Sequence, residues 1–270
     1  MNEVTTFRWS FRKDVENFQR AGYRSMGVWR YKLADWGEER AVDLLAESEL
    51  SVSNLLWAGG FTGSDGRSLQ ESLDDAADAL RLAAALQAHC LVVYPGGRNN
   101  HTFRHAGRLL RTAIEELLPL AETVEVPLAI QPKHAACAAE WSFLTDIESV
   151  LDLIQECDSP YLKLAYDTYH FPLDLQNRVL LADVVPHLGI VHLGDRRLAP
   201  SVDRERCPLG CGQLPLTEIV ASLIEAGYTG PFDVKLMGQE IETIDYWALL
   251  DQSRQAFSDM VPAAIPRSLA

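Results

Sequence analysis

The apolar residues of the chain alternate between two patterns, and the first is that of buried strands. Short, nearly continuous apolar runs recur at similar intervals, as is typical of parallel strands covered on both faces. The runs that we predict to be strands are SMGVWR (25–30), LSVSNLLW (50–57), CLVVYP (90–95), PLAIQP (127–132), YLKLAYD (161–167), LGIVHLGD (188–195) and PFDVKL (231–236). A weaker run, VTTFRW (4–9), precedes them and would be the first strand.

Helical periodicity occupies the segments between these runs. The sequence SLQE (68–71) is a capping box, and it opens a stripe of apolar residues at helical spacing. A second box, TDIE (145–148), predicts the start of another helix. Further helices are predicted over about 14–20, 35–47, 102–122, 174–185, 215–226 and 240–257.

Strands that alternate with helices along the whole chain predict an α/β fold. The pattern favours a single (β/α)8 TIM barrel over residues 1–270, with its pocket at the C-terminal ends of the strands. The alternative is a doubly wound open sheet, which normally has a glycine-rich turn after its first strand. WSFR (9–12) is not such a turn, so we expect the barrel.

Composition and charge narrow the class of ligand. Of the 270 residues, 47% are hydrophobic and 23% are charged, which is ordinary for a globular protein. A net charge of −14 disfavours nucleic acid or an anionic membrane as a partner and fits a small polar molecule better. The chain lacks a long apolar run or a signal-peptide pattern, and its five cysteines are scattered. We therefore expect a cytoplasmic protein.

Four consecutive predicted strands end in polar residues. Gln131, Asp167, His192 and Lys235 each follow an apolar run directly. In a barrel of this kind the C-terminal strand ends and the loops after them carry the chemistry. These four side chains are therefore expected to meet at one pocket.

Five segments at these strand ends occur in a recognisable order. They are LAIQPKH (128–134), DTYH (167–170), HLGD (192–195), PLGCG (208–212) and AGYTGPFDVK (226–235). Together the sequence resembles the xylose isomerase-like barrels, a group of sugar isomerases, 3-epimerases, inosose dehydratases and endonuclease IV relatives. The resemblance covers nearly the whole chain and implies a barrel that acts on a small carbohydrate.

The resemblance also implies a divalent metal, held by Glu, Asp, His and Glu on strands five to eight. Those positions fall on Gln131, Asp167, His192 and Lys235. Both glutamates are replaced, which removes one unit of negative charge at Gln131 and two at Lys235. At a separation of ~4 Å and an effective dielectric constant of ~20, each unit of ligand charge changes the electrostatic energy by ~4 kcal/mol for each charge on the metal ion. We therefore expect no metal cofactor at this position, where Gln131, Asp167 and His192 would be the remnants of the family's ligand set. If the Lys235 side chain points elsewhere, a divalent metal (Mn, Zn or Co) is expected instead.

Lys235 is the central candidate for catalysis. An ammonium beside Asp167, within reach of Gln131 and His192, could replace the metal as the electrophile and stabilise an oxyanion. It could also form a Schiff base, or be an inert salt bridge with Asp167. The predicted catalytic group is Lys235 with Asp167, His170 and His192.

The predicted substrate-binding residues come from both halves of the chain. They are Gln131, His134, Arg197, Trp57 and Tyr94. His134 lies in the loop after a strand, and Arg197 would suit an anionic group. The two aromatic residues end strands, where their rings could pack on the apolar face of a sugar.

These observations predict a sugar or polyol isomerase/epimerase-like protein that works without a metal. We lean towards an enzyme. A non-catalytic barrel that binds a sugar or sugar phosphate is the alternative, and an endonuclease IV-like repair enzyme is a more distant one. Seven histidines and the net charge of −14 disfavour the repair enzyme, which needs several metals. The sequence leaves open which sugar is bound and whether the chain forms a homo-oligomer.

Overall fold

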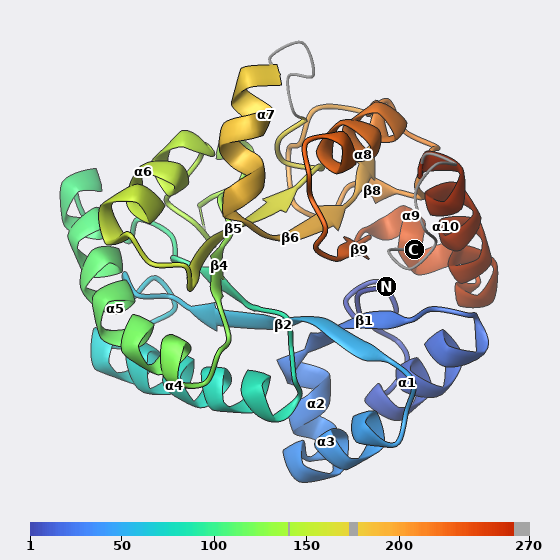
Figure 1. The fold of residues 1–270 in the computed structure, drawn as a ribbon, viewed down its shortest axis with the longest axis horizontal. Coiled ribbons are helices and arrows are strands. Elements are labelled where there is room, and N and C mark those ends of the chain that lie inside the picture. Colours follow the sequence, from blue (N-terminus) through green and yellow to red (C-terminus); the bar gives the residue numbers. More distant parts are fainter. Residues whose placement is uncertain (140, 173–177, 262–270) are drawn as a thin grey trace.

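The sheet has the strand order of a barrel. The computed structural model of the protein describes residues 1–139, 141–172 and 178–261. Within these ranges, seven parallel strands pair in chain order around one sheet (Figure 1). They are β1 (Ser25–Trp29), β2 (Ser51–Gly59), β3 (Leu91–Tyr94), β4 (Leu128–Ile130), β5 (Leu162–Asp167), β6 (Leu188–Leu193) and β9 (Phe232–Val234). The seven strong apolar runs are thus confirmed as strands.

Helices surround the sheet on its outer side (Figure 1). Their bounds are α1 (Phe11–Arg20), α2 (Arg30–Trp36), α3 (Glu38–Ala46), α4 (Leu69–Ala85), α5 (Phe103–Thr123), α6 (Glu148–Cys157), α7 (Arg178–Val184), α8 (Leu216–Glu225), α9 (Gln239–Thr243) and α10 (Tyr246–Met260), with short 3-10 turns η1 (Ala135–Cys137) and η2 (Val185–His187). The helices predicted over 35–47 and 240–257 are each split in two. The helix predicted over 174–185 begins at residues that lie outside the described ranges. None of the helices in the described ranges is long and apolar enough to cross a membrane.

The two predicted capping boxes have different outcomes. The side chain of Ser68 accepts the Glu71 N–H and the Glu71 carboxylate accepts the Ser68 N–H, so the box at α4 is confirmed. The box at α6 is wrong, because Asp146 takes the capping role and accepts the Ser149 N–H at 2.7 Å. Asp146 comes one position after Thr145, and its carboxylate accepts the backbone N–H in place of the threonine hydroxyl.

The predicted first strand, 4–9, is wrong. Residues 3–9 form turns, and the strand position is taken by the residues just before them. The Asn2 N–H donates to Val234 O at 2.9 Å and the Glu3 N–H to Gly27 O at 3.0 Å, so this segment closes the ring between β9 and β1 (Figure 1). The threonines suggested a strand, but Thr6 instead bonds Asp14 at 2.7 Å within a folded turn.

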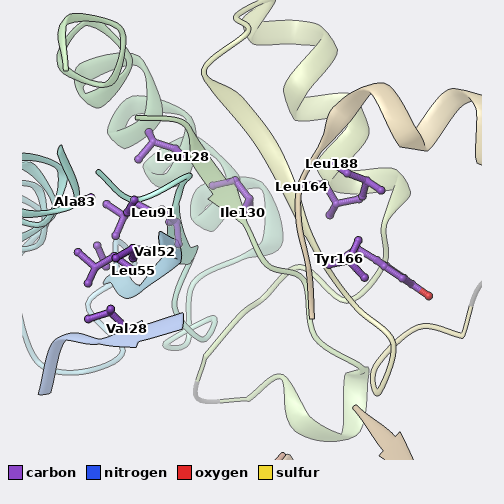
Figure 2. Packing of buried hydrophobic residues seen from close by; sticks show 14 of the residues in the cluster. Val28, Val52, Leu55, Ala83, Leu91, Leu128, Ile130, Leu164, Tyr166 and Leu188 are labelled. Atoms are coloured by element: carbon purple, nitrogen blue, oxygen red, sulfur yellow. The ribbon is translucent and has the colours of Figure 1, made fainter. Parts of the chain in front are cut away.

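Two layers of side chains result from the alternation along each strand. Figure 2 shows the outer layer, in which Val28, Leu55 and Ile130 belong to the core that the strands share with the helices. The inner layer fills the barrel and is composed of Leu56, Cys90, Val92, Tyr94, Ala129, Ala165 and Ile190. Gln131, Asp167 and His192 each come two residues after a member of the inner layer, so their side chains point into the barrel.

Two short strands follow β6. β7 (Asp195–Arg196) pairs antiparallel with β8 (Arg206–Cys207) and closes the loop 197–205. The carboxylate of Asp195 accepts the backbone N–H of Gly210 at 3.0 Å and of Gly212 at 2.9 Å, which fixes the glycine-containing segment after β8. A side chain at Gly212 would collide with Asp195, since its Cβ would lie 2.1 Å from Oδ1. This hairpin places β8 over the barrel mouth.

Candidate functional site

A cavity of about 660 Å³ opens at the C-terminal ends of the strands. The residues that line it include the aromatic side chains of Trp29, Trp57, Tyr94 and Trp141. The ring centroid of Trp57 lies 5.4 Å from that of Tyr94 and 5.3 Å from that of Trp141. Its charged lining includes Lys133, Asp203 and Lys235. The volume is within the usual range for a small-molecule site.

Lys235 follows β9 and is 1% exposed. Its Nζ donates to Tyr94 Oη at 3.0 Å and to Gln131 Oε1 at 3.3 Å, and lies 3.7 Å from Asp167 Oδ2. The structure therefore brings together the four sequence-predicted residues Lys235, Gln131, Asp167 and Tyr94. Burial lowers the pKa of Lys235, and the nearby Asp167 opposes that shift.

Asp167 is bound on both oxygens by an arginine that sequence reasoning missed. Arg206 of β8 donates to Asp167 Oδ1 and Oδ2, each at 3.0 Å, and Gln131 Nε2 donates to Oδ2 at 3.0 Å. Burial alone would raise the pKa of Asp167, but the Arg206 guanidinium outweighs it and holds that pKa well below its ordinary value. Asp167 is thus a fixed anion.

A second carboxylate, Asp203, also belongs to the cluster. It forms an ion pair with Lys133 and accepts a bond from Arg206 Nη2 at 3.0 Å. His170 Nε2 lies 3.1 Å from its Oδ1. Burial would raise the pKa of Asp203, and the Lys133 ammonium holds it well below its ordinary value instead. Sequence reasoning missed Lys133, Asp203 and Arg206; the last two lie in the arginine-rich stretch 196–206, the one signal that could have indicated them.

The two histidines lie deeper than the cavity surface. Burial lowers the pKa of His170, whose Nδ1 accepts the His134 backbone N–H at 3.4 Å. Burial and Lys235 lower the pKa of His192 further. Within the described ranges neither ring nitrogen of His192 has a hydrogen-bond partner, and its Nε2 lies 3.9 Å from Asp233 Oδ2. Burial thus favours the neutral form of both imidazoles.

The remaining predicted residues have different locations. Trp57 lines the cavity, as Tyr94 does. His134 is half-buried and its Nδ1 accepts the Ala136 N–H at 3.2 Å, so only its backbone reaches the cluster. Arg197 is exposed and pairs with Glu240 at 2.7 Å, outside the cavity lining. A substrate-binding role for Arg197 therefore stays a prediction, and the position of Arg197 outside the cavity lining does not support it.

The residues at the family metal position do not fit a divalent cation. Such an ion requires free oxygen ligands, usually carboxylates. Here the Asp167 carboxylate is engaged by the Arg206 guanidinium, Gln131 Oε1 accepts from Lys235, and the Lys235 ammonium stands where a carboxylate would be needed. In the described part of the chain no group of three or more His, Cys, Asp and Glu residues could hold a metal ion. What this arrangement offers a ligand is a buried ammonium at the cavity surface, which can polarise an oxygen.

Comparison with known proteins gives a family and partial relatives. The family model described as "Xylose isomerase-like TIM barrel" matches residues 15–248. A D-psicose 3-epimerase of Enterocloster bolteae is 29% identical over 137 residues. That match covers 49% of this chain and 40% of the epimerase, so it spans less than half of either protein.

Solved structures share the fold over almost the whole chain. A protein of Sinorhizobium meliloti 1021 superposes with a TM-score of 0.88 at 24% identity, covering 96% of this chain and 97% of its own. An IolI protein solved with a bound zinc atom superposes with a TM-score of 0.82 at 17% identity, covering 96% of each chain. At these identities the likeness establishes the barrel architecture alone.

Proposed function

Since the chain belongs to the xylose isomerase-like TIM barrel family, we propose that it is a sugar isomerase/epimerase-like enzyme that works without a metal at the family position. The observation that carries this proposal is the state of Lys235. Its ammonium is buried at the floor of the cavity, and its two hydrogen bonds go to the neutral acceptors Tyr94 and Gln131. It is placed to receive an oxygen atom of a ligand.

An ammonium has three N–H donors, of which Lys235 uses two within the described residues. A substrate carbonyl oxygen would accept the third. When a base removes the proton from the neighbouring carbon, the electron pair of that C–H bond forms a C=C bond. The π pair of the carbonyl then moves to its oxygen, which gives an enediolate. The ammonium stabilises this oxyanion, as a metal would in the metal-dependent reaction. Return of a proton to the same carbon from the opposite face gives the epimer.

The wall of the cavity supports a carbohydrate as the ligand. Trp57 and Trp141 meet edge to face at an interplanar angle of 88°, and both line the cavity. Aromatic faces of this kind pack against the C–H groups of a sugar ring, while polar groups at the floor bind its oxygens. The partial match to a D-psicose 3-epimerase supports a ketose of similar size.

The second candidate is a barrel that binds a carbohydrate without turnover, and one specific observation favours it. Among the described residues, the carboxylates that line the cavity are Asp203 and Glu242. Asp203 is paired with Lys133 and Arg206, and its lowered pKa makes it a weak base. Epimerisation therefore depends on Glu242 or on a bound water as the proton carrier.

Solvent deuterium exchange separates the two candidates. Chelator-treated protein would be incubated with D-psicose, D-fructose or D-tagatose in D₂O, and loss of the proton signal beside the carbonyl followed by NMR. We expect exchange that falls by about 100-fold in Lys235→Met, because the oxyanion loses its stabilising donor. Lys163→Met is the matched control, since Lys163 Nζ bonds Pro186 O outside the cavity.

Two outcomes would contradict the proposal in different ways. Binding of these sugars without any exchange would establish the non-catalytic barrel. Exchange that appears only on addition of Mn²⁺ would show that the protein uses a metal after all.

A further inference from the structure

The buried charges under the cavity do not cancel. Three cations, Lys133, Arg206 and Lys235, stand against two carboxylates, Asp167 and Asp203. The two histidines of the cluster are neutral or would add positive charge, so the sum over the described residues is at least one positive charge in either state. A buried uncompensated cation is costly, and it is unexpected in a chain whose net charge is −14.

The excess charge resides on Lys235. Arg206 is engaged with both oxygens of Asp167, and Lys133 is paired with Asp203. The nearest carboxylate oxygen to Lys235 Nζ, that of Asp167 Oδ2, is 3.7 Å away and already accepts from Arg206. Within the described ranges, Lys235 therefore shares its neighbouring anion and has no carboxylate of its own.

The next carboxylate inward does not compensate this charge. Asp233 accepts the amide donors of Asn2 at 2.6 Å and of Asn54 at 2.7 Å, and its Oδ1 lies 3.6 Å from the amino group of Met1. Its charge is thus engaged one layer deeper in the barrel. Among the described residues, the carboxylates near Lys235 are thus engaged elsewhere, and the side of Lys235 that remains faces the cavity.

We propose that the natural ligand of the cavity carries an anionic group, a carboxylate or a phosphate, that binds between Lys235 and Lys133. The two ammonium groups converge on one place: Lys133 Nζ lies 4.6 Å and Lys235 Nζ 5.7 Å from the ring centroid of Tyr94. Both residues line the cavity, and Trp57 and Trp141 beside them offer surfaces for a carbon skeleton. The ligand class is therefore a small sugar acid or sugar phosphate. The inference rests on the proposed function only in using the same cavity, because it requires binding and not turnover.

Isothermal titration calorimetry with matched pairs of ligands tests this. Each pair shares a carbon skeleton and differs in charge: D-gluconate with D-glucitol, and D-fructose 6-phosphate with D-fructose. We expect one anionic member to bind about 30-fold or more tightly than its neutral partner, since a buried charge pair contributes strongly to affinity. The pair that shows the preference tells whether the group is a carboxylate or a phosphate.

Two variants tie the preference to the lysines. Lys235→Met and Lys133→Met should each reduce the preference, which is the ratio of the two affinities within a pair, to within about threefold. Lys163→Met, outside the cavity, should retain it. Both cavity variants are expected to fold, because Arg206 still contacts Asp167 and Asp203, and thermal unfolding checks this.

Equal affinity within both pairs, no binding of either anionic ligand, or a preference that survives both substitutions would each overturn the inference. The outcome is separable from that of the exchange experiment. Anion preference without deuterium exchange leaves this inference standing and removes the proposed turnover. Exchange on neutral ketoses without anion preference removes this inference alone.

Discussion

Two of the buried lysines, Lys32 and Lys235, have different surroundings. Lys32 of α2 donates to Glu3 O at 3.0 Å and Thr6 O at 2.9 Å and forms an ion pair with Asp14, so all three of its donors are used. Lys235 bonds two neutral groups, shares Asp167 with an arginine and lines a cavity. Because every N–H donor of Lys32 is used, this lysine holds the N-terminal segment against the barrel. Within the described residues, Lys235 has one N–H donor left over, which is available to a ligand.

Removal of the two lysines should therefore have unequal effects on stability, and this is the largest difference we expect. Lys32→Met leaves Asp14 without its cation and should lower the free energy of unfolding by about 3–5 kcal/mol. Lys235→Met should change it by less than about 1 kcal/mol, or raise it, because Arg206 still neutralises Asp167. Urea unfolding at pH 7 measures both. Equal losses would mean that Lys235 is a structural residue like Lys32.

Asp167 sharpens the comparison through its pH dependence. Its pKa in the folded protein lies below the unfolded value of about 3.9, so its stabilising effect is present above that pH and is lost as the pH falls. Asp167→Asn should cost about 3 kcal/mol at pH 7, since Arg206 loses its main partner. Unfolding measured from pH 7 down to about pH 3 should show the gap between wild type and variant narrowing below about pH 4. A gap that is constant with pH would contradict the assigned ion pair.

Arg197 is where the smallest effect is expected. Its guanidinium pairs with Glu240 on the surface, away from the cavity lining. Arg197→Ala should leave the melting temperature unchanged and alter the affinity for the anionic ligands by less than about threefold. Calorimetry on the same pairs of ligands checks this. A large loss of affinity would restore Arg197 to the anion-binding role that the sequence suggested.

The fold was predictable where burial imposes a repeating pattern. Continuous apolar runs indicated the seven strands of the barrel sheet, β1 to β6 and β9, because parallel strands are covered on both faces. The segment 4–9 misled because Thr5 and Thr6 favour strands, yet their hydroxyls bond groups that the tertiary structure places nearby. No periodicity in the sequence records such partners.

The site was predictable only in part, for a related reason. The order of motifs located Lys235, Asp167 and Gln131, since each lies at the end of a strand or directly after it, and the barrel brings strand ends together. Asp203 and Arg206 come from the hairpin of β7 and β8, whose return over the mouth has no periodic signature. Arg206 is the most important of the residues that the sequence did not indicate. Its guanidinium neutralises most of the charge of Asp167, and the ammonium of Lys235 is therefore free for a ligand.

The metal content of the protein tests the central claim, that a cation has replaced the metal of this family. Protein purified without chelator or added metal would be measured by mass spectrometry, beside the double variant Gln131→Glu, Lys235→Glu. The account predicts a metal-free native protein, and any gain of a divalent ion on restoring the carboxylates should occur in the variant alone. About one equivalent of manganese, zinc or cobalt in the native protein would contradict it.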